Sequence, residues 1–211
     1  MTPKKISYEH TALTIIKKLK KRGMEGYYCP TSKEAVEKAM TLMEDASTVA
    51  FGGSTTLQET GMLEALKKSN HTVIDRTVAK TPEEKREIYA RSVMADDYFM
   101  SANAITLDGE LVNIDGEGNR VACLITGPKQ VMVLVGMNKV ATSVKEAVNR
   151  VQNMAAPPNG VRLGLQTPCS VIGVCSDCYT KDCMCCQVVI TRKSKKDGRI
   201  KVILIGEELG F

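Results

Sequence analysis

Six of the eight cysteines in this 211-residue chain gather between residues 169 and 186. The main frame of candidate metal ligands is Cys169, Cys175, Cys178 and Cys185. The C-x-x-C spacing of Cys175 and Cys178 lets two thiolates face one ion, and four thiolates suit either zinc or an iron–sulfur cluster. Free thiols and a redox pair are the alternatives, and Cys183 and Cys186 could also serve as ligands. The spacing does not choose between these possibilities.

A second chemical feature is a glycine- and hydroxyl-rich turn that follows an apolar stretch ending at Phe51. The turn consists of Gly52, Gly53, Ser54, Thr55 and Thr56. Glycines let a ligand approach the backbone closely, and the unpaired N–H groups at a helix start attract an anion. The alternative is a plain helix N-cap, which Ser and Thr form routinely. Neither a Walker A loop nor a G-x-G-x-x-G pattern is present, so nucleotide binding is not indicated.

The stretch from residue 101 to residue 120 is dense in polar and glycine residues. Those expected to line the same pocket as the glycine-rich turn are Asn103, Asp115, Asn119 and Arg120. Arg120 could clamp a carboxylate or phosphate through two parallel hydrogen bonds. The alternative is a pair of hairpins whose Asn, Asp and Gly residues serve turns. No firm catalytic base emerges, and the weak candidates are Glu59 and Asp115.

The composition narrows the classes of partner. The formal charge is +5, and 43% of the residues are apolar, as in ordinary globular proteins. Scarce aromatic residues and the absence of a helix-turn-helix or RNA-binding signature argue against nucleic acid. The start of the chain lacks an apolar signal segment, and the apolar run from Val131 to Val135 is too short to span a bilayer. We therefore expect a cytoplasmic protein with no membrane partner, where clustered cysteines favour metal or redox chemistry over disulfides.

Strand and helix patterns alternate along the chain, which predicts a mainly parallel sheet between helices. We expect one helix from about Thr56 to Lys68, a central strand at residues 131–135 and a helix from Ser143 to about Met154. The sequence Pro157-Pro158-Asn159-Gly160 then marks a boundary. The expected organisation is an α/β core over residues 1–156. A Cys-rich segment follows over residues 157–211, with a β-hairpin made of strands 188–192 and 200–205.

Four longer motifs occur together in the chain: S-A-N-A-I-T-x-D-G-E-L-V-N-I-D-G-x-G-N-R from Ser101, F-G-G-S-T-T-L from Phe51, G-P-K from Gly127 and T-P-C from Thr167. In combination they resemble the lactate-utilisation (LUD) domain family. The resemblance implies the three-layer α/β/α sandwich shared by ribose-5-phosphate isomerases, glucosamine-6-phosphate deaminases and class I CoA transferases. It also implies a role around lactate oxidation, in which members act with iron–sulfur partner proteins. The four cysteines of the main frame resemble a T-P-C…C-x-x-C…C pattern within the family.

One position departs from the CoA transferases of that superfamily. Their nucleophile is a Glu two residues before a Gly, and the matching position here is Leu107, which carries no carboxylate. CoA transfer is therefore not expected. Our first hypothesis is a protein of lactate or related organic-acid metabolism that binds a small anionic metabolite at Gly52–Thr56. The second is a non-catalytic accessory subunit that holds an iron–sulfur cluster or zinc for electron transfer or assembly. Assembly into a homo-oligomer is left open.

Overall fold

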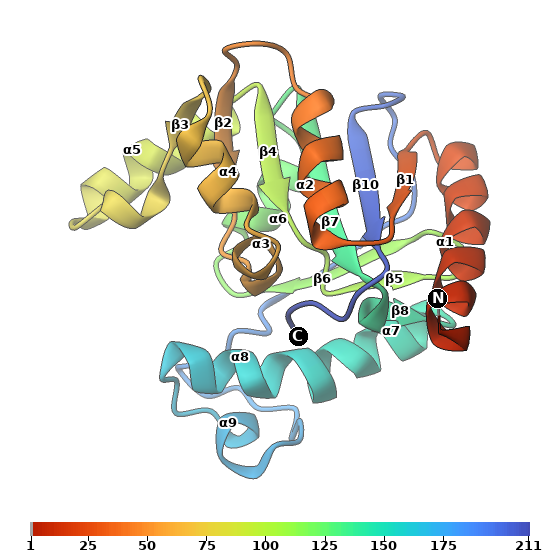
Figure 1. Cartoon of the computed structure of the whole chain (residues 1–211). Helices are drawn as coiled ribbons and strands as arrows, with labels where there is room; N and C mark the ends of the chain where they lie inside the picture. Colours follow the sequence, from red (N-terminus) through yellow and green to blue (C-terminus); the bar gives the residue numbers. More distant parts are fainter. Residues whose placement is uncertain (1) are drawn as a thin grey trace.

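The structure is a computed structural model that describes residues 2–211, and its main sheet has six parallel strands (Figure 1). In spatial order these are β1 (Glu25–Cys29), β10 (Ile200–Ile205), β7 (Gln130–Gly136), β4 (Asp97–Met100), β2 (Thr48–Phe51) and β3 (Thr72–Ile74). Every neighbouring pair runs parallel. The apolar run at residues 131–135 forms the interior of β7, between β10 and β4, as expected for a strand covered on both faces.

Helices cover both faces of this sheet. One face carries α1 (Pro3–Lys21), α5 (Pro82–Val93) and α6 (Asn119–Ile125), and the other carries α2 (Ser32–Thr41), α3 (Thr55–Glu59) and α4 (Met62–Lys68). Successive side chains of β7 point to opposite faces, so Val131 and Val133 pack in the first layer while Met132 and Leu134 pack in the second. The expected three-layer α/β/α sandwich is therefore confirmed.

A second, four-stranded sheet lies at the ends of β4 and β7, in the lower part of Figure 1. Its order is β8 (Val140–Ala141), β5 (Ala104–Thr106), β6 (Leu111–Asp115) and β9 (Gln187–Thr191). β5 and β6 pair antiparallel across the turn at Asp108-Gly109, as the sequence predicted. Helix α7 (Val144–Arg150) packs on this sheet through Ala147. The second sheet thus closes the carboxyl ends of the main strands.

The hairpin expected near the C-terminal end does not form. β9 pairs antiparallel with β6, whereas β10 inserts between β1 and β7 of the main sheet. The reason is composition, because Ile200–Ile205 is apolar on both faces and β9 is largely exposed. Between them, the buried Arg199 guanidinium donates to the carbonyls of Cys123, Leu124 and Pro128. These hydrogen bonds fix the loop between β9 and β10 against the end of α6, so the loop does not form a hairpin turn.

The proline pair does not interrupt the helix that precedes it. After α7 the chain makes a wider π-helical turn at Val151–Ala155 and continues as α8 (Ala156–Leu163). Pro157 and Pro158 lie in the first turn of α8, where a missing N–H is tolerated. A short helix, α9 (Pro168–Ile172), follows α8, and residues 173–186 contain no helix or strand. The helix therefore extends well beyond its predicted end at Met154.

Two further local differences have simple causes. The helix expected from Thr56 to Lys68 is split into α3 and α4, because Gly61 takes a left-handed conformation at φ +76°. After Asp115 the chain forms α6 rather than a second hairpin, with Gly118 at φ +84° at the start of the helix. Two short 3-10 helices, η1 (Arg76–Val78) and η2 (Met137–Lys139), complete the fold. Within residues 2–211, no helix has the length and apolar character needed to cross a membrane.

Candidate functional site

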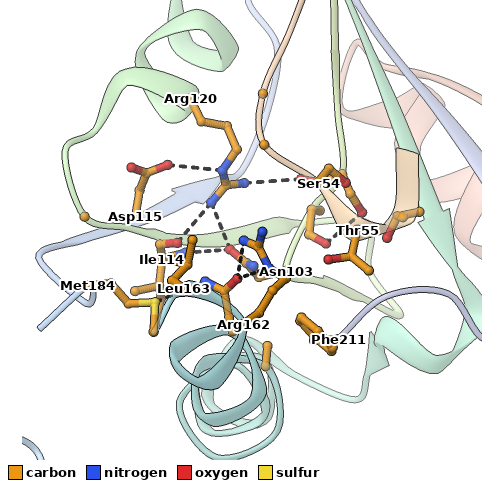
Figure 2. A pocket seen from close by; sticks show the side chains of 18 of the residues that line it. Ser54, Thr55, Asn103, Ile114, Asp115, Arg120, Arg162, Leu163, Met184 and Phe211 are labelled. Carbon is orange, nitrogen blue, oxygen red and sulfur yellow. Dashed lines mark hydrogen bonds and ion pairs between the residues drawn. The ribbon is translucent and has the colours of Figure 1, made fainter. Parts of the chain in front are cut away.

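A cavity of about 550 Å³ lies where the main sheet, the second sheet and α8 meet (Figure 2). It is bordered by the ends of β2, β4 and β7, the place where parallel sheets commonly bind ligands. The predicted residues that line it are Gly52, Gly53, Ser54, Thr55, Thr56, Asn103, Asp115, Asn119 and Arg120. The π-helical turn contributes Val151 and Ala155 to the same wall. Residues far apart in the sequence thus converge on one space.

The glycine-rich turn fits this position closely. The Gly52 N–H donates to the Phe99 carbonyl at 2.9 Å, which continues the pairing of β2 with β4. A Cβ on Gly52 would lie 3.1 Å from both Arg120 Cγ and Tyr98 Oη, so a side chain there would crowd the cavity wall. The Ser54 hydroxyl accepts a hydrogen bond from the Leu57 N–H and caps α3. The turn therefore acts as a helix cap and also forms part of the cavity wall.

Arg120 is fully engaged by the protein itself. Its Nε donates to Asp115 Oδ2 at 3.1 Å, and Nη1 donates to Asn113 Oδ1 and the Ser101 carbonyl. Nη2 donates to Asn103 Oδ1 and the Ile114 carbonyl, both at 3.0 Å. A guanidinium has five N–H donors, so these contacts use all of them. The expected role as a ligand clamp is therefore not supported by this geometry, and Arg120 instead ties α6 to the second sheet (Figure 2).

The two candidate bases are also engaged in internal contacts. Asp115 Oδ1 accepts from the Gly118 N–H at 2.8 Å, and its other oxygen pairs with Arg120. Glu59 is not among the residues that border the cavity, and its Oε2 accepts from the Gly210 N–H at 2.6 Å. Both carboxylates therefore have positions explained by the fold. The Asn103 and Asn119 side-chain oxygens likewise accept from Arg120, through its side chain and its backbone N–H respectively.

A residue that sequence reasoning missed is Lys139, at the end of η2 directly after β7. It is 4% exposed and borders the cavity. Its Nζ donates to the hydroxyls of Thr56 at 2.8 Å and Ser101 at 3.1 Å. An ammonium has three donors, so one remains after these two contacts. The available signal was its place, since a polar residue just past a buried parallel strand lies at the ligand-binding edge.

Burial lowers the pKa of Lys139 to about 7, and the nearby cations of Arg150 and Arg120 act in the same direction. Within the described chain, residues 2–211, no carboxylate lies within 4.0 Å of its Nζ. The cavity wall also carries Arg76 and Arg162, against the acidic Glu117. Because Asp115 is neutralised by Arg120, the remaining charge of the wall is positive. The cavity is thus suited to an anion.

Comparisons with known proteins agree with this architecture. A family model described as the LUD domain matches residues 13–205. The chain belongs to the LUD domain family. A DUF162 family protein from Deinococcus radiodurans is 11% identical over 94% of this LUD domain protein and 98% of its own chain, with a TM-score of 0.56. At this identity the likeness concerns the fold alone.

Two other solved structures resemble smaller parts of the LUD domain. The delta subunit of eIF2B from Chaetomium thermophilum is 17% identical, with a TM-score of 0.36 over 56% of this chain and 50% of its own. Ribose 5 phosphate isomerase A from Neisseria gonorrhoeae is 12% identical, with a TM-score of 0.35 over 54% of each chain. These scores are too low to support a conclusion. No curated protein matched the chain.

The clustered cysteines of this LUD domain border a second cavity, of about 480 Å³. They are Cys169, Cys175, Cys178, Cys183, Cys185 and Cys186, all free thiols. Burial raises the pKa of the Cys185 thiol to about 12, and Cys183 and Cys175 act in the same direction. Among residues 2–211, no three His, Cys, Asp or Glu side chains stand together as a ready metal site. The ligand assignment therefore stays a prediction.

The two cavities adjoin. Met184 and Cys185 border both of them, as does Ala156 at the start of α8. Met184 is fixed from the α8 side, because its Sδ accepts from Asn159 Nδ2 at 3.1 Å and its Cε lies near Gly160. These three residues therefore form a shared wall between the positively charged cavity of the LUD domain and the cysteine cavity.

Proposed function

We propose that this LUD domain protein binds a small organic acid of lactate or related metabolism in the cavity beside Gly52–Thr56. The observation that carries the proposal is Lys139, a buried cation that borders the cavity and lacks a carboxylate partner within residues 2–211. An unpaired buried charge is costly, and a bound anion offsets that cost. Its remaining N–H donor is available for a carboxylate oxygen.

The rest of the wall suits a short carbon skeleton that carries a carboxylate. Ser54 and Thr55 offer hydroxyl groups on the same turn as Thr56, which Lys139 contacts, and Arg162 of α8 adds a second cation to the cavity wall (Figure 2). Apolar surface comes from Phe51, Leu163 and Phe211. Ligand sites commonly combine an apolar lining with a few polar groups that fix orientation. A small organic acid satisfies both parts of this lining.

Lys139 also provides acid–base chemistry. A group whose pKa is near 7 is partly neutral at physiological pH, so it can accept a proton from a ligand hydroxyl and return it. Asp115 and Glu59 are less suited to exchanging a proton with a ligand, because internal hydrogen bonds hold both carboxylates. We infer that any proton transfer in this cavity runs through Lys139 Nζ.

The test is calorimetric titration of the full chain with L-lactate and with pyruvate, using lactamide as the uncharged control. Lys139→Met keeps the length of the side chain and removes its charge, and Lys145→Met on the exposed face of α7 is the matched control. We expect Lys139→Met to weaken acid binding at least about tenfold, or about 1.4 kcal/mol. Lys145→Met should bind like the wild type.

Two results would contradict the proposal. One is a wild-type protein that binds lactamide as tightly as lactate, or that binds neither acid at millimolar concentration. The other is a folded Lys139→Met protein with unchanged affinity. Circular dichroism and the unfolding midpoint of each variant establish that it is folded.

A further inference from the structure

The segment from residue 173 to residue 186 is not held together by a hydrophobic core. It contains no helix or strand, and its apolar side chains face solvent, with Tyr179 95% exposed and Val174 52% exposed. The adjoining Val171 and Ile172 of α9 are exposed as well. Long loops of this kind in compact domains usually have a function, and small units without a core need a cross-link or a metal. No disulfide forms among the described cysteines.

Three hydrogen bonds nevertheless fix where the segment lies. The Cys175 N–H donates to Asn153 Oδ1 at 3.1 Å, beside the π-helical turn. Asp182 Oδ2 accepts from the Gln166 N–H at 3.0 Å, and the Cys186 N–H donates to the Asp115 carbonyl at 3.1 Å. The segment is thus anchored at its start, middle and end, and its thiols border a common cavity.

The chemistry of these donors selects the class of ligand. Thiolates are soft ligands that prefer iron–sulfur clusters, zinc or copper(I) over hard cations. A single zinc ion needs four sulfurs about 2.3 Å from one centre, whereas a cluster spreads its thiolates over several iron atoms. The six thiols border one space of about 480 Å³. Among residues 2–211, however, no three of them stand close enough together to hold a single ion, and this wide spacing favours the polynuclear group.

We propose that this cavity binds one iron–sulfur cluster through Cys169, Cys175, Cys178 and Cys185. Cys185 lies among the other thiols, while Cys169 on α9 is buried at the base of the cavity. Cys186 is exposed, and its Sγ donates to the Cys183 carbonyl at 3.3 Å, so we leave it outside the proposed ligand set.

The experiment uses the full chain, purified without oxygen and then incubated with ferrous iron and sulfide. We expect bound iron and acid-labile sulfide, broad visible absorption and a paramagnetic resonance signal after reduction. Cys178→Ser should bind iron at least about tenfold more weakly, whereas Cys186→Ser, the matched control, should bind it like the wild type. In the loaded wild type, alkylation should label Cys186 and spare the four proposed ligands, a readout that needs no variant.

Three outcomes would overturn the proposal. The first is zinc bound tightly with no retention of iron and sulfide, which would make the segment a single-ion site. The second is full alkylation of all six thiols after reconstitution. The third is an equal loss of iron in Cys178→Ser and Cys186→Ser when both variants remain folded, which would place the cluster elsewhere or show that it is adventitious.

Discussion

Around the charged cavity the polar side chains pair with one another, whereas around the cysteine cavity most thiols have few partners and some are open to solvent. Arg120 and Asp115 show the first case, since every donor of the guanidinium has an acceptor within the protein. Cys178 shows the second, because its Sγ accepts a long 3.7 Å contact from Thr180, neighbours the Cys183 thiol and lies on a loop. The side chains of the charged cavity are therefore held in place by the protein itself, whereas the thiols are not, and the ligand proposed for the cysteine cavity would have to order them.

The largest expected effect is on the stability of the paired region. Arg120→Ala should lower the free energy of unfolding by about 3–5 kcal/mol, because it leaves the Asp115 carboxylate buried without its cation. Arg162→Ala, which removes an exposed arginine bonded to Asn159, should cost less than about 1 kcal/mol. Urea titrations followed by circular dichroism give both values. An Arg120→Ala protein as stable as Arg162→Ala would show that the first cavity is not preorganised by this network.

A smaller effect is expected at the glycine-rich turn. Gly52→Ala should cost about 1–3 kcal/mol, because its Cβ would press on Arg120 and Tyr98, which cannot both move freely. Gly53→Ala is the control, since the nearest atom to its Cβ is 4.0 Å away. Thermal unfolding of the two variants side by side tests this. Equal unfolding midpoints for Gly52→Ala and Gly53→Ala would show that Arg120 and Tyr98 can move to admit the extra methyl group. The cavity wall would then not be rigidly organised.

The smallest effect is a pH dependence that separates ligand binding from stability. An anion prefers the protonated form of Lys139, whose pKa in the free protein is about 7. Affinity for lactate should therefore stay level below about pH 6, fall roughly twofold between pH 6 and pH 7, and fall roughly fivefold between pH 7 and pH 8. In Lys139→Met this slope should vanish. Calorimetry at several pH values measures this dependence of affinity on pH. An identical dependence in the wild type and in Lys139→Met would show that Lys139 does not contact the bound acid.

The sequence was informative where one physical rule dominates. The apolar run at residues 131–135 can only be a covered strand, and Gly52–Thr56 follows such a strand, so its position at the edge of the sheet could be predicted. It was less informative where two rules compete. Pro157 and Pro158 usually end a helix, yet a preceding π-helical turn lets them begin α8. The Val- and Ile-rich sequences of β9 and β10 predict strands but not their partners.

Individual roles in the cavity were harder to predict than its location. Arg120 was placed correctly beside the turn, but the sequence does not show that five acceptors would use its donors. Lys139 was missed because its place after a strand indicates the ligand-binding edge but does not tell a buried lysine from a solvated one. Lys139 is buried by the residues that follow β10. Gly210 is one of them, and a Cβ added there would lie 3.3 Å from Lys139 Nζ. Such long-range covering leaves no local pattern.

The shared wall of Met184 and Cys185 has a thermodynamic consequence. If fixing Cys185 on one side changes the affinity for an acid on the other by some factor, then the acid must change the affinity of the thiols by the same factor. Such linkage needs no large movement of the chain. It needs only that Cys185 contributes both to acid binding in one cavity and to ligation by the thiols in the other. If both proposed ligands bind, the occupancy of one cavity would change the affinity of the other through Cys185, so a single chain would respond jointly to the supply of iron and the supply of metabolite.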